Sequence, residues 1–197
     1  MVLTTLGVGA MNSPRYAPAG LLLAHRGVRV MFDGGPGAEP PGRLDAWLVT
    51  DARAELMREI RRAAARRGLI PRVGAFRRRG LVIEPRAVVH TSHPAFGYRI
   101  RVARRTVVWA PEFFRFPAWA RGADVVFADA AAWGRPIRFA GGVGGHADAL
   151  TTAAAARRAG VKRLVFAHIG RPTLRALARG ARPPFGVFAA DGQRFVA

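Results

Sequence analysis

The sequence contains no cysteine, a single lysine and few acidic residues, and each shortage excludes something. Without cysteine the chain can form no disulfide, no zinc–thiolate site and no thiol nucleophile, which fits a reducing compartment. No uncharged stretch approaches the roughly twenty apolar residues that a membrane-spanning helix needs. The first seven residues also lack the basic segment that opens a signal peptide. We therefore expect a cytoplasmic protein without a membrane segment.

The charge that is present has mostly one sign. Lys and Arg together number 32 against 12 Asp and Glu, a formal net charge of +20. Nearly all of these bases are arginine, whose planar guanidinium can make paired contacts with phosphate. Such a chain attracts RNA, DNA or phosphorylated small molecules. A G+C-rich genome also produces arginine-rich proteins, so composition alone leaves both explanations open. The basic turn Arg77–Arg79 likewise indicates either a solvated hairpin tip or an RNA-binding arm.

The length of 197 residues, half of them apolar, predicts a single domain over residues 1–197 with a sizeable core. Hairpin patterns dominate the first half, as in the apolar runs 19–24 and 28–32. In the second half, strand patterns at 125–128 and 161–167 alternate with helical spacing. This mixture favours an α/β sandwich of mixed sheets with outer helices over a doubly wound parallel sheet.

Shorter patterns complete the expected element order. A helix is predicted over 52–67, a short helix over 117–121 and a longer one over 148–158. A last hairpin is expected from strands 187–190 and 193–196, joined by the turn Asp191-Gly192.

Five segments, in order along the chain, carry motifs of one family. They are Leu3–Pro14 with its glycine loop, Leu21–Gly37 with Asp-Gly-Gly-Pro-Gly, His90–Ile100 with Gly-Tyr-Arg-Ile, Val107–Glu112 with Ala-Pro-Glu, and Gly145–His168 with Gly-His and Gly-Val-Lys-Arg-Leu-Val. Together they resemble the metallo-β-lactamase superfamily, and the last is similar to the ribonuclease Z and phosphodiesterase branch. The resemblance implies a four-layer αββα sandwich. It also implies a phosphodiesterase-like hydrolase that activates water with zinc or manganese.

The main metal-binding motif of that family is changed in this chain. After the strand at 44–50 the family pattern reads Thr-His-x-His-x-Asp-His, but here the segment reads Thr50-Asp51-Ala52-Arg53-Ala54-Glu55-Leu56. Three histidines are absent and the aspartate is replaced by glutamate. The resemblance leaves five candidate ligands, namely Asp51, Glu55, His90, Glu112 and His168. So carboxylate-rich a set suits Mn²⁺ or Mg²⁺ better than zinc.

The resemblance also places His146 at a proton-donor position. From its place before an alanine-rich helix, His146 or the neighbouring Asp148 is equally able to shape the helix N-terminus. Asp129 follows a buried strand and could orient His146 or His168. Asp33 is expected to brace the glycine loop below the site by accepting backbone N–H groups.

Arg53 separates two hypotheses about function. A guanidinium cannot bind a metal ion, so at a ligand position it predicts an ion pair with Glu55, Glu112 or Asp51. In the first hypothesis the chain is a hydrolase, with water activated among the carboxylates and with Glu55 and His146 as catalytic groups. In the second it is an inactive relative that binds an anion or RNA. A homodimer is compatible with either.

Overall fold

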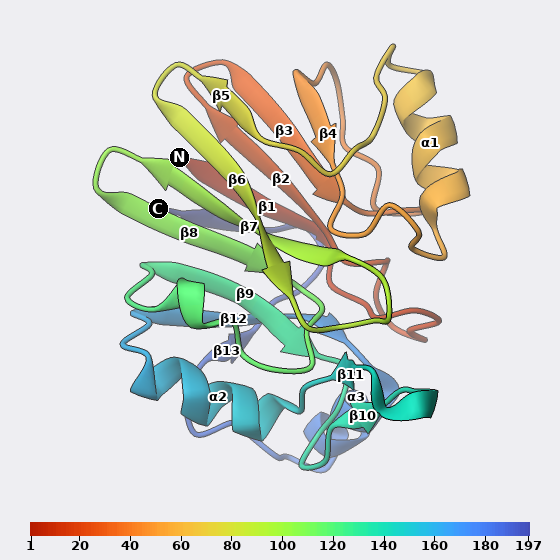
Figure 1. Ribbon diagram of the computed structural model, residues 1–197, viewed down its shortest axis with the longest axis vertical. Coiled ribbons are helices and arrows are strands. Elements are labelled where there is room, and N and C mark those ends of the chain that lie inside the picture. The colour runs from red at the N-terminus through yellow and green to blue at the C-terminus, as the bar shows by residue number, and fades with distance from the viewer.

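Two β-sheets pack face to face in the computed structural model, which describes residues 1–197 (Figure 1). The first sheet has the strand order β14-β1-β2-β3-β4, and the second has the order β13-β12-β9-β8-β7-β6-β5. Both sheets contain parallel and antiparallel pairs. Helix α1 (Met57–Ala65) covers the outside of the first sheet, and α2 (Ala149–Arg158) lies against β9 and β12 of the second. The predicted four-layer sandwich is confirmed.

The strand bounds follow the apolar patterns closely. The first sheet contains β1 (Val2–Gly7), β2 (Gly20–His25), β3 (Val28–Asp33), β4 (Ala46–Leu48) and β14 (Gln193–Val196). The second contains β5 (Phe76–Arg78), β6 (Leu81–Val88), β7 (Ala95–Val102), β8 (Arg105–Ala110), β9 (Val125–Ala130), β12 (Arg163–Ile169) and β13 (Val187–Phe188). A separate small pair is formed by β10 (Ile137–Arg138) and β11 (Gly145–His146). Helix α3 (Arg171–Ala178) follows β12.

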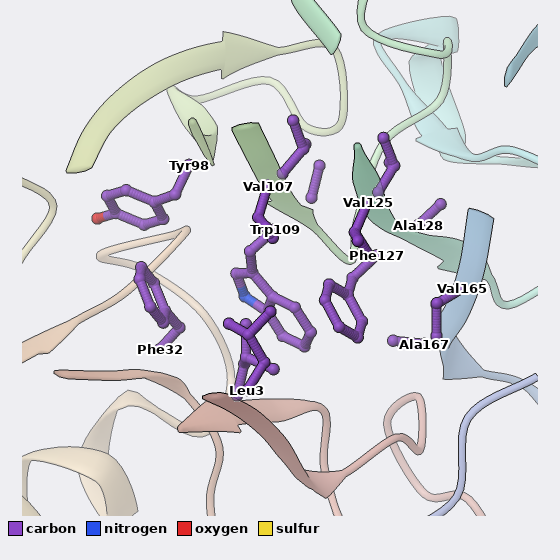
Figure 2. Packing of buried hydrophobic residues seen from close by; sticks show 14 of the residues in the cluster. Leu3, Phe32, Tyr98, Val107, Trp109, Val125, Phe127, Ala128, Val165 and Ala167 are labelled. Carbon is purple, nitrogen blue, oxygen red and sulfur yellow. The ribbon is translucent and has the colours of Figure 1, made fainter. Parts of the chain in front are cut away.

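The core lies between the two sheets, where alternate strand residues point inward (Figure 2). Leu3 and Phe32 from the first sheet meet Tyr98, Trp109 and Phe127 from the second, and all five are fully buried. A second cluster joins Met57 and Ile60 of α1 to Trp47 and its neighbours on the outer face of the first sheet. The apolar side of α1 thus makes the first sheet buried on both faces.

Three sequence expectations are corrected by the structure. The last two strands form no hairpin, because β13 pairs with β12 in one sheet and β14 pairs with β1 in the other. The turn at Asp191 crosses between the sheets, and its carboxylate accepts the backbone N–H groups of Val8 and Ala17. The helix predicted over 52–67 begins only at Met57, since the preceding loop belongs to the cavity described below. The short helix predicted over 117–121 is a 3₁₀ turn.

No helix in the structure is long and apolar enough to cross a membrane.

We expect the loss of the Phe127 side chain to weaken the packing between the two sheets. Its ring centroid lies 5.2 Å from that of Phe195 on β14 and 5.8 Å from that of Trp109 on β8, so it joins the two sheets. Replacing Phe127 with alanine leaves a cavity and should lower the free energy of unfolding by about 3–5 kcal/mol. Urea denaturation measures this change. Val196→Ala, at a side chain that is 79% exposed, serves as the control and should cost less than about 0.5 kcal/mol.

Candidate functional site

A cavity of about 590 Å³ opens at one edge of the sandwich, where loops that follow several strands converge. The glycine loops after β1 and β3 form one wall, and the loop between β4 and α1 forms another. The ends of β6, β8, β11 and β12 supply the histidines and Glu112. The cavity is lined by nearly all the predicted site residues, namely Asp33, Asp51, Arg53, Glu55, His90, Glu112, His146 and His168. Asp129 lies immediately behind them.

Glu112 lies between two histidines at the centre of this group. One carboxylate oxygen is 2.8 Å from His168 Nε2, and the other is 3.4 Å from His90 Nε2. Burial alone would raise the pKa of Glu112, but the charges of His168 and His90 outweigh it and hold that pKa well below its usual range. His90 is fixed from behind, since its Nδ1 lies 2.9 Å from the carbonyl oxygen of Gly145.

The same electrostatic coupling acts on the two imidazoles. Burial opposes a charge on His168, yet the neighbouring Glu112 and Asp129 raise its pKa to about 10. For His90, burial likewise lowers the pKa, and the hydrogen bond to Glu112 more than compensates, so its pKa is raised. The pocket therefore holds positive charge on imidazole at neutral pH when no other cation is bound.

Asp129 anchors a second pair at the end of β9. It is fully buried, and its carboxylate accepts backbone N–H groups from Phe113 and Ala131. His146 Nδ1 lies 2.8 Å from the same carboxylate, and His168 Nδ1 lies 3.6 Å from it. Burial would raise the pKa of Asp129, but His146 and His168 lower it. The carboxylate thus orients the His146 ring, while Asp148 caps helix α2 by accepting N–H groups from Leu150 and Thr151.

His168 is held in an unusual backbone conformation. It has a φ of 55°, in the left-handed region that residues other than glycine rarely adopt. The regular pairing of β12 with β9 is interrupted between Ala167 and Ile169, so the backbone turns at His168. Its imidazole packs flat against that of His146, with ring centroids 5.0 Å apart. Such strain, retained at a cavity, is typical of functional positions.

The loop that should carry the metal-binding motif is arranged differently from our expectation. Asp51 is buried, and one oxygen lies 2.7 Å from His93 Nε2 while the other accepts the backbone N–H of Arg53. This i to i+2 bond closes a tight turn of the kind that aspartate favours. The guanidinium of Arg53 is exposed and forms no ion pair with Glu55, Glu112 or Asp51, so that expectation is wrong. Histidine rings, not arginine, contact Asp51 and Glu112.

The other two candidate positions of the loop, Glu55 and Leu56, supply no buried metal ligand. Glu55 lies at the exposed rim and contacts none of the buried histidines by hydrogen bond or ion pair. Leu56 turns its methyl groups towards Gly35, where an added Cβ would lie only 2.9 Å from Leu56 Cδ1. Gly35 has a φ of 153°, a backbone conformation that favours glycine.

Asp33 ties the two sheets together beneath the cavity. Its Oδ1 accepts the backbone N–H and the hydroxyl of Thr50, and its Oδ2 accepts the indole N–H of Trp109 at 2.7 Å. Burial raises the pKa of Asp33 to about 7, although these hydrogen bonds act in the opposite direction. The residue therefore braces the start of the 50–56 loop rather than the glycine loop that follows it.

His93 and Phe139 belong to the site but were not assigned a role from the sequence. His93 precedes a proline in a loop, and only the fold brings it to Asp51. Phe139 packs edge-on against His90 and His146, at centroid distances of 5.4 Å and 5.5 Å. No spacing in the sequence pointed to either contact.

The donor set does not fit the two-metal centre that the sequence motifs imply. Such a centre needs several ligands from the 50–56 loop, and that loop offers only Asp51, which is already bonded to His93 and to its own backbone. The remaining donors that converge are His90, Glu112 and His168. Asp129, His146 and His168 also have ligand atoms within 4.8 Å of one another. Both carboxylate oxygens of Asp129 already accept backbone N–H groups, and Asp129 also contacts the rings of His146 and His168. We therefore interpret Asp129 as the residue that orients these two histidines.

The pKa of His168 predicts how stability depends on pH. Because this pKa is raised from 6.5 to about 10, the stabilising charge is complete below pH 6.5 and is lost as the pH rises towards 10. The free energy of unfolding should fall over that range. His168→Gln should cost about 3 kcal/mol near neutral pH, because it leaves Glu112 without its closest partner. The substitution should also flatten the pH dependence of the free energy of unfolding. Urea denaturation of the unmodified protein and of His168→Gln across this pH range measures the effect. An equal loss of stability in both proteins would contradict the prediction.

The exposed position of Arg53 predicts a small effect of its removal. Arg53→Ala should change the free energy of unfolding by less than about 0.5 kcal/mol, because its side chain makes no ion pair. Asp51→Ala removes two contacts of a buried carboxylate and should cost about 2 kcal/mol. Thermal and chemical denaturation of the two variants test this contrast. A larger cost for Arg53→Ala than for Asp51→Ala would refute the arrangement described for the loop.

Comparison with known proteins places the chain in a family. The sequence model of the beta-lactamase superfamily domain matches residues 39–169. No curated protein sequence matches the chain significantly. The metallo-beta-lactamase fold protein YhfI from Bacillus subtilis has a similar structure, with a TM-score of 0.77 and 16% identity over 99% of both chains.

Two further solved structures have the same fold. A diphosphatase from the PhnP family gives a TM-score of 0.77 at 18% identity, covering 100% of this chain and 97% of its own. The short form of human tRNase Z gives a TM-score of 0.72 at 15% identity, covering 100% of this chain and 99% of its own. Identities this low establish the fold and not the activity. With the family model matching most of the sequence, the chain belongs to the beta-lactamase superfamily and has the metallo-β-lactamase fold.

Proposed function

We propose that this protein binds a phosphorylated small molecule in the cavity and does not hydrolyse it through a two-metal centre. The observation that carries the proposal is the state of the 50–56 loop. Its only buried carboxylate, Asp51, is engaged by His93, and Arg53 lies where the family pattern has a histidine. An arginine cannot act as a ligand and repels a cation.

The charges around the cavity favour an anion. Arg53 and Arg171 are exposed at its rim, and the charge of His168 offsets part of the carboxylate charge within it. Arginine suits phosphate because its fork can bind two oxygens at once. Glu55 and Glu112 oppose this attraction, so the arginines at the rim are the groups that we expect to contact the phosphate. Hydrolysis would still require an activated water, for which this loop offers no metal-bound position.

The size and lining of the cavity suggest the rest of the ligand. A volume of about 590 Å³ lies in the range of sites for small molecules. Leu56, Met57 and Ile60 line the side next to α1, opposite the histidines. An organic phosphate with an apolar or aromatic portion matches these two walls. The diphosphatase and tRNase Z structures that share the fold are by name proteins of phosphate chemistry, which supports this ligand class.

A second candidate function is hydrolysis of a phosphate ester with one bound metal ion. The observation in its favour is that His146 is held by Asp129 beside the convergent donors of His90, Glu112 and His168. A histidine backed by a buried carboxylate can give a proton to a leaving oxygen. This alternative requires the imidazoles of His90 and His168 to be neutral, as metal ligands are.

Metal content and ligand binding distinguish the two functions. Protein purified without chelator should contain far less than one zinc, manganese or iron per chain by elemental analysis. Inorganic phosphate and aryl phosphates should bind in calorimetry, and Arg53→Gln with Arg171→Gln should weaken binding by about tenfold, corresponding to loss of charged hydrogen bonds. Arg61→Gln with Arg62→Gln, on the exposed side of α1, removes the same charge and should have little effect.

The outcome that favours hydrolysis is equally clear. One metal ion per chain, together with turnover of an aryl phosphodiester that His168→Gln and His146→Gln abolish, would replace our proposal by the second function. Substituting histidine at Arg53 and Leu56 should restore part of the ligand set. We expect that double variant to take up zinc or manganese that the unmodified protein does not hold.

A further inference from the structure

The outer face of the second sheet carries a row of arginines that the cavity does not involve. Helix α2 lies against β9 and β12, away from β6 and β7 (Figure 1). On β7 the inward residues Tyr98 and Ile100 are fully buried, so the alternate residues Arg99 and Arg101 point outward. We call this surface, made by Arg77, Glu84, Arg86, Arg99, Arg101 and Trp119, the basic sheet face.

One carboxylate serves three of these arginines. Glu84 on β6 lies 2.8 Å from Arg77, 3.2 Å from Arg101 and 3.8 Å from Arg86. These three arginines are 65%, 43% and 48% exposed, so their ion pairs are weak and leave most N–H donors free. The shared contacts hold three guanidinium groups within 3.8 Å of one carboxylate. This is a pre-organised surface for several phosphates rather than a neutral network.

Arg99 has no partner at all. It lies directly opposite Glu84 in the β6–β7 register, yet Glu84 forms its ion pairs with the other three arginines. The Nε atoms of Arg99 and Arg101 are buried without any hydrogen-bond acceptor. Buried donors without a partner are uncommon and call for an explanation. Arginine on an edge strand can be explained as protection against aggregation. That explanation does not apply to β7, which is an interior strand of this sheet.

An aromatic ring continues the same row. The Trp119 indole lies over Gly97, since a Cβ added there would come within 3.0 Å of the ring, and its N–H donates to the carbonyl of Ala87. Gly97, Arg99 and Arg101 alternate along one face of β7, about 7 Å apart. The row therefore begins with a half-buried indole, packed against the core, and continues with two cations.

We propose that the basic sheet face binds a single-stranded polynucleotide, with phosphates on Arg86, Arg99 and Arg101 and a base stacked on Trp119. An open sheet with an aromatic ring beside basic side chains is suited to unstacked bases, which a duplex does not offer. An anionic membrane or an acidic protein would use the charge alone, whereas unstacked bases can also use the indole ring. This inference does not depend on the proposed function, because none of these residues lines the cavity.

The test uses the whole protein and a fluorescently labelled single-stranded oligonucleotide, RNA in one arm and DNA in the other. Anisotropy titrations should show binding at low salt, and the logarithm of the association constant should fall against that of salt with a slope of about −2 for three phosphate contacts. Arg99→Gln with Arg101→Gln should weaken binding at least tenfold and flatten that slope by about one. Trp119→Ala should weaken binding about tenfold, whereas Trp119→Phe should keep most of it.

A matched variant separates a site from general charge. Arg61→Gln with Arg62→Gln on α1 also removes two of the positive charges, and its affinity should stay close to that of the unmodified protein. Thermal unfolding confirms that each variant is folded before it is titrated. Equal losses in both double variants, binding to duplex or anionic vesicles as tight as to single strands, or no binding at low salt would each overturn the proposal.

Discussion

Glu112 and the two imidazoles on either side of it form the interaction on which the site depends. Three elements that are distant in sequence supply them: the end of β6, the end of β8 and the end of β12. A buried carboxylate is costly unless it is paired, and the same holds for a buried imidazolium. Each therefore stabilises the position of the others, and together they hold the strand ends around the cavity. The Asp129–His146 pair extends this network by one layer.

The charged groups that line the cavity differ from those of a two-metal hydrolase. In such a site the cations are metal ions, and several carboxylates and neutral imidazoles bind them. Here the motif loop contributes Arg53 and Leu56 in place of ligands, and its one buried carboxylate, Asp51, is bonded to His93. Positive charge comes from the side chains themselves. Under our proposal, such a pocket takes an anion where a two-metal hydrolase takes cations.

The basic sheet face and the cavity illustrate two uses of arginine in one chain. At the rim of the open cavity, Arg53 and Arg171 lie singly, and on this arrangement we base the proposed small anion. On the sheet, the arginines form a row held by one glutamate and continued by Trp119, which suits a chain of phosphates with exposed bases. The large net charge does not distinguish these two surfaces. They differ in shape and in the residues that surround their arginines.

The sequence by itself determined the family resemblance and the general architecture. Local patterns carry that information, since strand alternation, short glycine turns and motifs such as those around Asp33 and His146 depend on neighbours along the chain. The same local reasoning placed most strands within a few residues. The family resemblance, rather than local patterns, supplied the candidate site residues, and most of them line the cavity.

The sequence could not determine which charged side chains contact one another. Arg53 was expected to pair with the carboxylates and is exposed, whereas His93 was given no role and holds Asp51. The last two strands read as a hairpin and belong to different sheets. Pairing between residues far apart in sequence depends on where the backbone places them and on which partner best offsets burial. Only the tertiary structure decides that, because no local pattern records the distance between Glu112, His90 and His168.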